Sequence, residues 1–130
     1  MANRYGEAAL LAAKGPSGLQ PGARWESALA KLYPTSPVAR LKGSPRAAFL
    51  GLCEEGLIQG VPAGDYDAPK VHKELAVRAV ALLKEGTQHW SRSALWQAVT
   101  DDSGKKETGQ IDVVLALWKN GLIVGKPKAG

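Results

Sequence analysis

The stretch LGLCEEGLIQGVP, residues 50–62, decides how this chain of 130 residues is organised. Its apolar start and its glycine at position 56 are typical of a helix that ends at glycine and continues as a short extended segment. A second stretch, LALWKNGLIVGKP at residues 115–127, follows the same pattern. At a constant offset of 65 the two stretches are identical at seven of thirteen positions. The sequence therefore predicts an internal duplication.

Start and stop signals around these stretches predict three helices in each half. Ser44 and Pro45, for example, are typical of an N-cap and a first helical position. The predicted helices span residues 4–13, 23–32 and 44–55 in the first half. In the second half they span residues 71–85, a segment that is capped by Ser91 or Ser93 and ends at about Val99, and residues 110–120. We expect a mainly α fold of two tandem three-helix, winged-helix-like repeats with very short strands, packed as one compact unit. The expected halves are residues 1–64 and 65–130.

The order helix, helix, loop, helix, glycine and short strand resembles the winged-helix arrangement over residues 4–62 and 71–127. That likeness implies that the third helix of each half is the recognition helix and that a hairpin wing follows it. A DNA-reading helix needs Arg, Lys, Asn or Gln on its exposed face. The helix at 44–55 ends in Glu54 and Glu55, and the helix at 110–120 carries Asp112. These acidic residues argue against base readout.

Three segments are similar to a family of small uncharacterised bacterial cytoplasmic proteins. They are YGEAA at residues 5–9, RAAFLGLCEEGLI at residues 46–58 followed by PAG at 62–64, and DVVLALW at 112–118 followed by GLI at 121–123. The resemblance covers most of the chain. It implies a bacterial cytoplasmic protein of unknown function, and it assigns a role to no residue.

Composition sets further bounds on the class of protein. No apolar run approaches the ~20 residues that a membrane helix needs, and the N-terminal residues do not resemble a signal peptide, so we expect a cytoplasmic protein. One cysteine, Cys53, excludes an internal disulfide and a cysteine-based metal cluster, and its apolar neighbours predict a buried thiol. The net charge of +5 permits anionic partners.

Residues with catalytic or metal-binding chemistry form no recognised motif, so we expect no cofactor and no metal, and an enzyme is not favoured. His72 is expected to be exposed and His89 to lie in a turn. Adjacent carboxylates such as Glu54 and Glu55 are expected to point apart, which does not suit acid–base catalysis. The segment 65–67 (Asp-Tyr-Asp) is typical of a turn. Only a catalytic set assembled from distant residues would make this protein an enzyme.

Basic residues gather just before the third helix of each half, where free helix N–H groups also attract anions. They form a possible anion or nucleic-acid contact that consists of Arg40, Lys42, Arg46, Lys105 and Lys106. The first hypothesis for function is a non-catalytic module that binds another protein or itself. The second is weak nucleic-acid binding through these five residues. The third is a small enzyme or ligand binder with a cleft between the repeats near residues 62–70, marked by a perturbed Glu54, Asp65 or His72.

Overall fold

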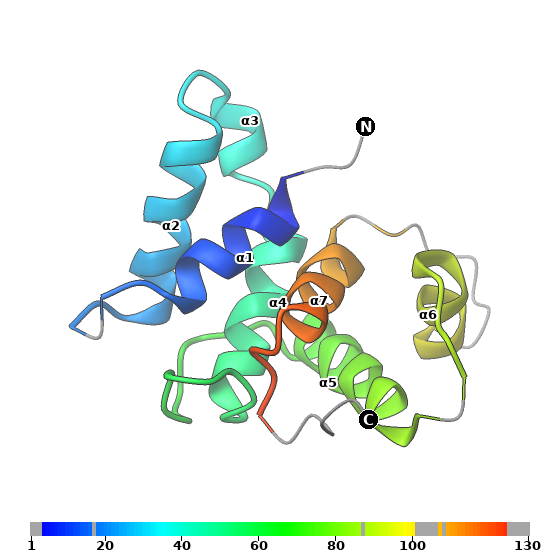
Figure 1. Ribbon diagram of the computed structural model, residues 1–130. Coiled ribbons are helices and arrows are strands. Elements are labelled where there is room, and N and C mark those ends of the chain that lie inside the picture. Colours follow the sequence, from blue (N-terminus) through cyan, green and yellow to red (C-terminus); the bar gives the residue numbers. More distant parts are fainter. Residues whose placement is uncertain (1–3, 17, 87, 101–106, 108, 125–130) are drawn as a thin grey trace.

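A computed structural model describes residues 4–16, 18–86, 88–100, 107 and 109–124, and the regular structure in this part of the chain is helical. The expected mainly helical, compact class is confirmed. The helices are α1 (Tyr5–Ala13), α2 (Pro21–Leu32), α3 (Pro37–Arg40), α4 (Gly43–Glu54), α5 (Lys70–Glu85), α6 (Arg92–Val99) and α7 (Gln110–Lys119) (Figure 1).

Most helix ends lie within two residues of the positions that the sequence predicts. Ser91 is the N-cap of α6, and its hydroxyl accepts a hydrogen bond from the Ala94 N–H at 3.1 Å. Gly86 ends α5 with a positive φ of 66°, a conformation that glycine adopts without strain. The predicted N-cap of α4 was wrong: Ser44 lies inside the helix, which begins at Gly43 with Lys42 as N-cap, and no side chain caps it.

Helix α3 was not predicted, because residues 33–44 read as a proline-rich connection. Ser36 caps it by accepting a hydrogen bond from the Ala39 N–H at 3.4 Å, and Pro37 occupies its first position. Four residues make a single turn, which is too short to show an apolar period. The cap and the proline were the available signals.

The core lies where α4 crosses its neighbours near the centre of the molecule (Figure 1). Trp25 of α2 stacks on Phe49 of α4, with ring centroids 5.4 Å apart. The predicted burial of Cys53 is confirmed, and burial raises the pKa of its thiol to about 12. Helix α1 packs on α2 and α7, while α4 packs on α5 and α7. The first helix of each predicted half therefore contacts the last helix of the other half.

Two small residues allow these crossings between the halves. A Cβ added to Gly51 in α4 would lie 2.7 Å from the Lys73 Cα in α5. A Cβ added to Gly6 in α1 would lie 3.0 Å from the Ala116 Cβ in α7. Real Cβ atoms do not approach so closely to a rigid backbone, so glycine is required where α4 meets α5.

The two matching stretches that define the predicted duplication meet in space. Ile58 and Ile123, which are 65 positions apart, form an isolated antiparallel bridge. The Gln59 N–H donates to the Leu122 carbonyl at 2.9 Å, and the Val124 N–H donates to the Leu57 carbonyl at 2.7 Å. The duplication as such stays a prediction, as does the division at residues 64 and 65.

The very short strands of the predicted repeats are reduced to this bridge. Within the described residues the chain forms no strand and no hairpin wing of the winged-helix kind. The physical reason is that each extended segment is cut short by glycine or proline and pairs with its counterpart instead of folding back on itself. The same part of the chain contains no helix that is both long and apolar enough to cross a membrane.

Candidate binding surface

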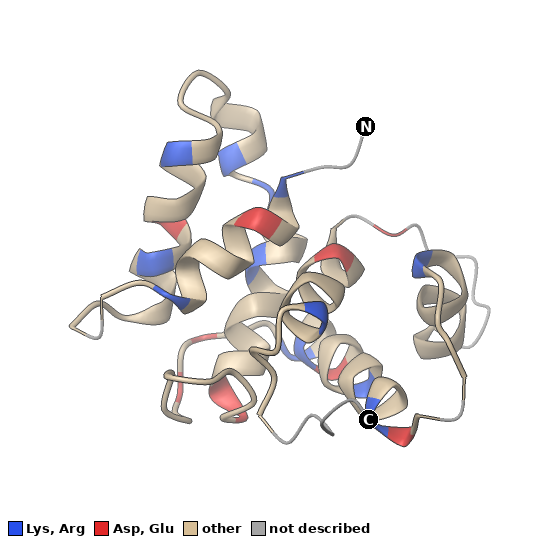
Figure 2. Cartoon of the chain, viewed as in Figure 1, with Lys and Arg blue, Asp and Glu red and all other residues tan. Residues whose placement is uncertain are grey.

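Positive charge is concentrated at one end of the molecule. Residues 4–46, which form α1, α2, α3 and the first turn of α4, carry 7 Lys and Arg against 2 Asp and Glu. Residues 47–124 carry 8 against 10. Figure 2 shows the basic side of this division around α2 and α3. We call residues 4–46 the basic lobe.

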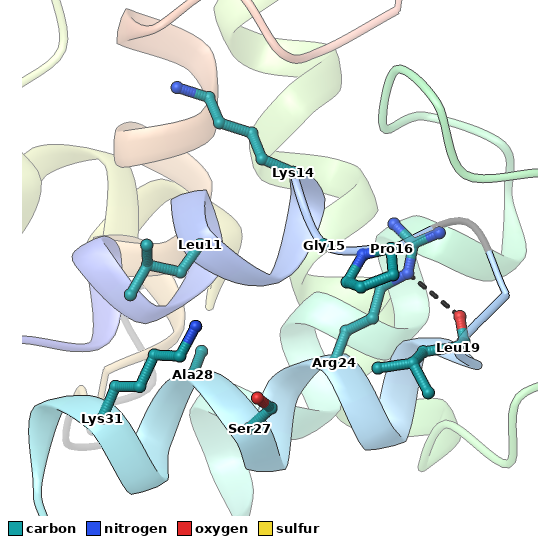
Figure 3. Close-up of a pocket in the computed structure, with 9 residues that line it drawn as sticks. All are labelled: Leu11, Lys14, Gly15, Pro16, Leu19, Arg24, Ser27, Ala28 and Lys31. Atoms are coloured by element: carbon teal, nitrogen blue, oxygen red, sulfur yellow. Dashed lines mark hydrogen bonds between the residues drawn. The ribbon is translucent and has the colours of Figure 1, made fainter.

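A pocket of about 230 Å³ lies in the basic lobe between the C-terminal half of α1 and α2 (Figure 3). Three of its lining residues are basic, and none of the described ones is acidic. The lining of this α1/α2 pocket consists of Leu11, Lys14, Gly15, Pro16, Leu19, Arg24, Ser27, Ala28 and Lys31.

Arg24 is the most unusual residue of the α1/α2 pocket. Its side chain rises from α2 to the connection between α1 and α2 (Figure 3) and is only 5% exposed. Its Nε donates to the Leu19 carbonyl at 3.0 Å and its Nη1 donates to the Ala13 carbonyl at 3.3 Å. Ala13 ends α1, so this carbonyl carries part of the negative end of the helix dipole.

No carboxylate among the described residues pairs with Arg24, because its bonds go to backbone carbonyls only. Buried charges in proteins are normally paired with an opposite charge, since an isolated charge loses its hydration. A guanidinium has five N–H donors, and these two bonds use two of them. The pocket therefore holds a positive charge whose compensation is incomplete.

Lys14 and Lys31 stand at the rim of the α1/α2 pocket, and both are exposed. In Figure 3 the side chain of Lys31 extends from α2 toward α1, whereas that of Lys14 extends away from the end of α1. Two apolar side chains share the rim: Leu11 is 43% exposed and Leu19 is 41% exposed. The pocket thus combines cations with apolar walls.

The five basic residues that the sequence singled out lie elsewhere. Arg40 is exposed at the end of α3, where it lines a separate hollow of about 240 Å³ with Glu26, Leu29 and Leu41. The ammonium of Lys42 lies 5.8 Å from the centre of the Tyr5 ring. Arg46 is half-buried, with its Nη2 close to Gly22.

Lys105 and Lys106 lie outside the described residues. The predicted contact formed by the five residues therefore stays a prediction. The residues that do meet in a pocket, Lys14, Arg24 and Lys31, were missed. Arg24 and Lys31 are seven residues apart on α2, a spacing that places both on one helix face, and this was the available signal.

The carboxylates near the expected cleft have a structural role. The Glu54 Oε2 accepts hydrogen bonds from the backbone N–H groups of Tyr66 at 2.8 Å and Ala68 at 3.1 Å. Lys73 contacts Glu54 at 3.0 Å and Glu55 at 2.9 Å. The expectation that Glu54 and Glu55 point apart was wrong, because Lys73 on α5 draws both toward it.

Burial of Glu54 favours its protonated form, but the Tyr66 and Ala68 N–H groups and Lys73 outweigh this effect and lower the pKa of Glu54. A carboxylate held in its charged form is a poor proton donor at neutral pH. The shift therefore does not favour the catalytic hypothesis.

The remaining candidate residues are also part of the local structure. The Asp65 Oδ1 accepts a hydrogen bond from the Asp67 N–H at 3.2 Å, which is the turn predicted for residues 65–67. The expected exposure of His72 was wrong: it is half-buried, and its Nδ1 lies 3.4 Å from the Gln110 Nε2. Within the described part of the chain, His, Cys, Asp and Glu side chains form no group of three that is suited to a metal ion.

Comparison with known proteins places the chain in a family. No curated protein and no solved structure matches it. A family model described as a family of unknown function (DUF6979) matches residues 2–124, which is most of the chain. This match confirms the resemblance to an uncharacterised family that the sequence segments indicated, and the chain therefore belongs to the family of unknown function DUF6979.

Proposed function

We propose that this protein is a non-catalytic binding module and that its α1/α2 pocket binds an acidic, partly apolar segment of a partner protein. The observation that carries the proposal is Arg24, a residue that is 5% exposed and whose guanidinium, among the described residues, is bonded only to backbone carbonyls. A carboxylate of the partner would supply the missing negative charge. Charge-assisted bonds between Arg and a carboxylate are among the strong hydrogen bonds of proteins.

The charge of the pocket lining supports an anionic occupant. Lys14, Arg24 and Lys31 line the pocket without an acidic neighbour among the described residues. The whole basic lobe carries an excess of five positive charges, which attracts an acidic partner from a distance.

The apolar walls and the size of the pocket support a protein segment as that occupant. Leu11, Leu19 and Pro16 offer apolar surface beside the cations. A volume of about 230 Å³ suits one or two side chains and is small for a larger ligand. Binding sites of this kind typically hold one buried anchor residue within a polar rim.

A second copy of the chain and nucleic acid are alternative partners. Residues 47–124 have an excess of acidic residues, so self-association would pair the two ends of the molecule. The binding of nucleic acid would depend on Arg40 and Lys42, which are exposed on either side of the exposed Leu41. We place the protein in the cytoplasm, a proposal that its single, buried cysteine supports.

Selection from a phage-displayed library of random peptides tests the proposal. The immobilised chain should enrich peptides in which Asp or Glu neighbours Leu, Ile or Phe. A labelled peptide from this selection should bind about tenfold or more weakly to the Lys31→Glu variant, because one attraction becomes a repulsion.

Lys70→Glu is the matched control. Lys70 is exposed at the start of α5, away from the pocket, and this substitution changes the net charge by the same amount as Lys31→Glu. It should leave peptide affinity nearly unchanged. The proposal is wrong if no acidic peptide is enriched, or if both variants weaken binding equally. Binding of labelled duplex DNA that requires Arg40 and Lys42 would favour nucleic acid instead, and light scattering would detect self-association.

A further inference from the structure

Helix α3 carries the two most exposed large apolar side chains in the described part of the chain. Val38 is 83% exposed, and Leu41, the C-cap of α3, is 82% exposed. Their spacing of three residues places both side chains on the same side of this helical turn. Single apolar side chains on a surface are common, but neighbouring ones that stay uncovered typically mark a contact site.

The backbone of α3 is fixed to the rest of the molecule. The Tyr5 hydroxyl of α1 donates a hydrogen bond to the Ala39 carbonyl at 3.0 Å, and α3 packs on α2. Val38 and Leu41 therefore stay exposed although α3 is held in place. In Figure 1, α3 and the connection from α2 lie at one end of the molecule. We call residues 37–42 the α3 knob.

The α3 knob has a net positive charge. Arg40 and Lys42 lie on either side of Leu41 in the sequence, and both are exposed. No carboxylate among the described residues forms an ion pair with either of them. Glu26 of α2 borders the same hollow as Arg40 and Leu41, so one carboxylate lies beside two cations. Over residues 27–53 the sequence has four basic residues and no acidic one.

The size and chemistry of the α3 knob favour a lipid surface over a protein or a nucleic acid. A standard protein interface takes about 20–30 residues from each partner, far more than residues 37–42 supply. Nucleic acid phosphates would pair with the cations but would leave Val38 and Leu41 in water. A membrane surface uses both kinds of side chain, because apolar groups enter the boundary between headgroups and acyl chains while cations stay beside anionic headgroups.

We infer that the α3 knob binds the surface of a membrane that contains anionic lipids. Val38 and Leu41 enter the boundary region, and Arg40 and Lys42 pair with lipid phosphates. Two apolar side chains and two cations give weak, reversible binding that salt weakens further. This contact needs no membrane-spanning helix. It depends neither on the α1/α2 pocket nor on the occupant proposed for that pocket.

Sedimentation of the chain with lipid vesicles tests the inference. One set of vesicles contains phosphatidylcholine alone, and the other contains equal parts of phosphatidylcholine and phosphatidylglycerol. We expect the affinity for the anionic vesicles to be about tenfold or more higher than that for the neutral ones. Added salt should release the chain from the anionic vesicles. Both measurements use the wild-type chain, so they stand whether or not a variant folds.

Val38→Ser combined with Leu41→Ser should weaken binding to the anionic vesicles about tenfold, because the apolar contribution is lost. Val71→Ser is the control for this change, since Val71 is an exposed apolar residue at the start of α5, and it should have little effect. The double variant should keep the wild-type affinity for the selected acidic peptide. Failure of this inference is therefore distinguishable from failure of the protein-binding proposal.

Arg40→Gln combined with Lys42→Gln should also weaken vesicle binding about tenfold. Lys70→Gln combined with Lys119→Gln removes the same charge at exposed positions elsewhere and should have a much smaller effect.

The inference is overturned if the chain binds neither kind of vesicle, or binds both equally. It is also overturned if the variant with serine at positions 38 and 41 binds anionic vesicles as tightly as the wild type, because only a non-specific attraction of cations would then remain. A dimer in light scattering that this variant abolishes would overturn it in favour of contact between two copies of the chain.

Discussion

At the scale of the residue, charged side chains in this protein are held in two different ways. Glu54 accepts hydrogen bonds from two backbone N–H groups and pairs with Lys73. Arg24 is buried against two carbonyls and lacks a carboxylate. The first arrangement fixes the connection between α4 and α5. The second leaves a charge without a carboxylate among the described residues, and this charge is the one that we propose an external anion neutralises.

Replacing Glu54 with Gln should lower the free energy of unfolding by about 1–2 kcal/mol at pH 7, because the charge-assisted bonds become neutral ones. The pKa of Glu54 is lowered in the folded state, so its stabilising effect is present above the pKa of the unfolded chain and is lost as pH falls through the folded value. The difference between wild type and variant should therefore shrink below about pH 4. Urea unfolding at several pH values measures both effects.

Glu55→Gln is the control for this experiment. Glu55 also contacts Lys73, but its side chain is 47% exposed. Exposed ion pairs contribute about 0–1 kcal/mol, so this variant should change stability far less. Equal losses from the two variants would contradict the structural role assigned to Glu54.

At the scale of the element, small residues set how closely helices approach. Gly51 lies in the middle of α4, where glycine usually destabilises a helix. Here it faces the Lys73 backbone of α5 at a distance that leaves no room for a Cβ. The gain from close packing of α4 on α5 thus outweighs the poor helix propensity. The sequence shows the glycine but not the neighbour that requires it.

Gly51→Ala should lower the free energy of unfolding by about 1–3 kcal/mol, because overpacking displaces α4 from α5. Gly43→Ala is the matched control: Gly43 lies at the start of the same helix, and a Cβ there would meet nothing within 4 Å. That variant should be neutral or more stable by up to about 1 kcal/mol. Thermal unfolding followed by circular dichroism compares them. A Gly51→Ala protein as stable as wild type would show that α4 and α5 have room to move apart.

At the scale of the whole molecule, the two predicted halves are joined by helix packing and by a backbone bridge. Helix α1 packs on α7, α4 packs on both α5 and α7, and the Ile58–Ile123 bridge links the two extended segments. Ile58 and Ile123 are each 1% exposed. A segment of ~65 residues buries a smaller fraction of its surface than a larger domain does and is only marginally stable alone. Because the two halves also cover each other's helices, we expect each half to need the other to complete its core.

We therefore expect the chain to unfold in a single cooperative transition, with tryptophan fluorescence and far-ultraviolet circular dichroism giving the same midpoint in urea. Residues 1–64 expressed alone should lack a cooperative transition, because α1 and α4 would expose the faces that cover α7 and α5. Two separate transitions in the full chain, or an independently folded 1–64 fragment, would contradict this.

The sequence by itself determined the helical class, most helix ends and the burial of Cys53, because periodicity, caps and glycine stops act over a few neighbouring residues. It also indicated the family, through the segments at residues 5–9, 46–64 and 112–123. It also showed the matching stretches at residues 50–62 and 115–127. Only the tertiary structure brought Ile58 to Ile123, both glutamates to Lys73, and Lys14, Arg24 and Lys31 to one pocket. These groupings depend on which helices cross and how closely, and that is decided by packing between segments distant in the chain.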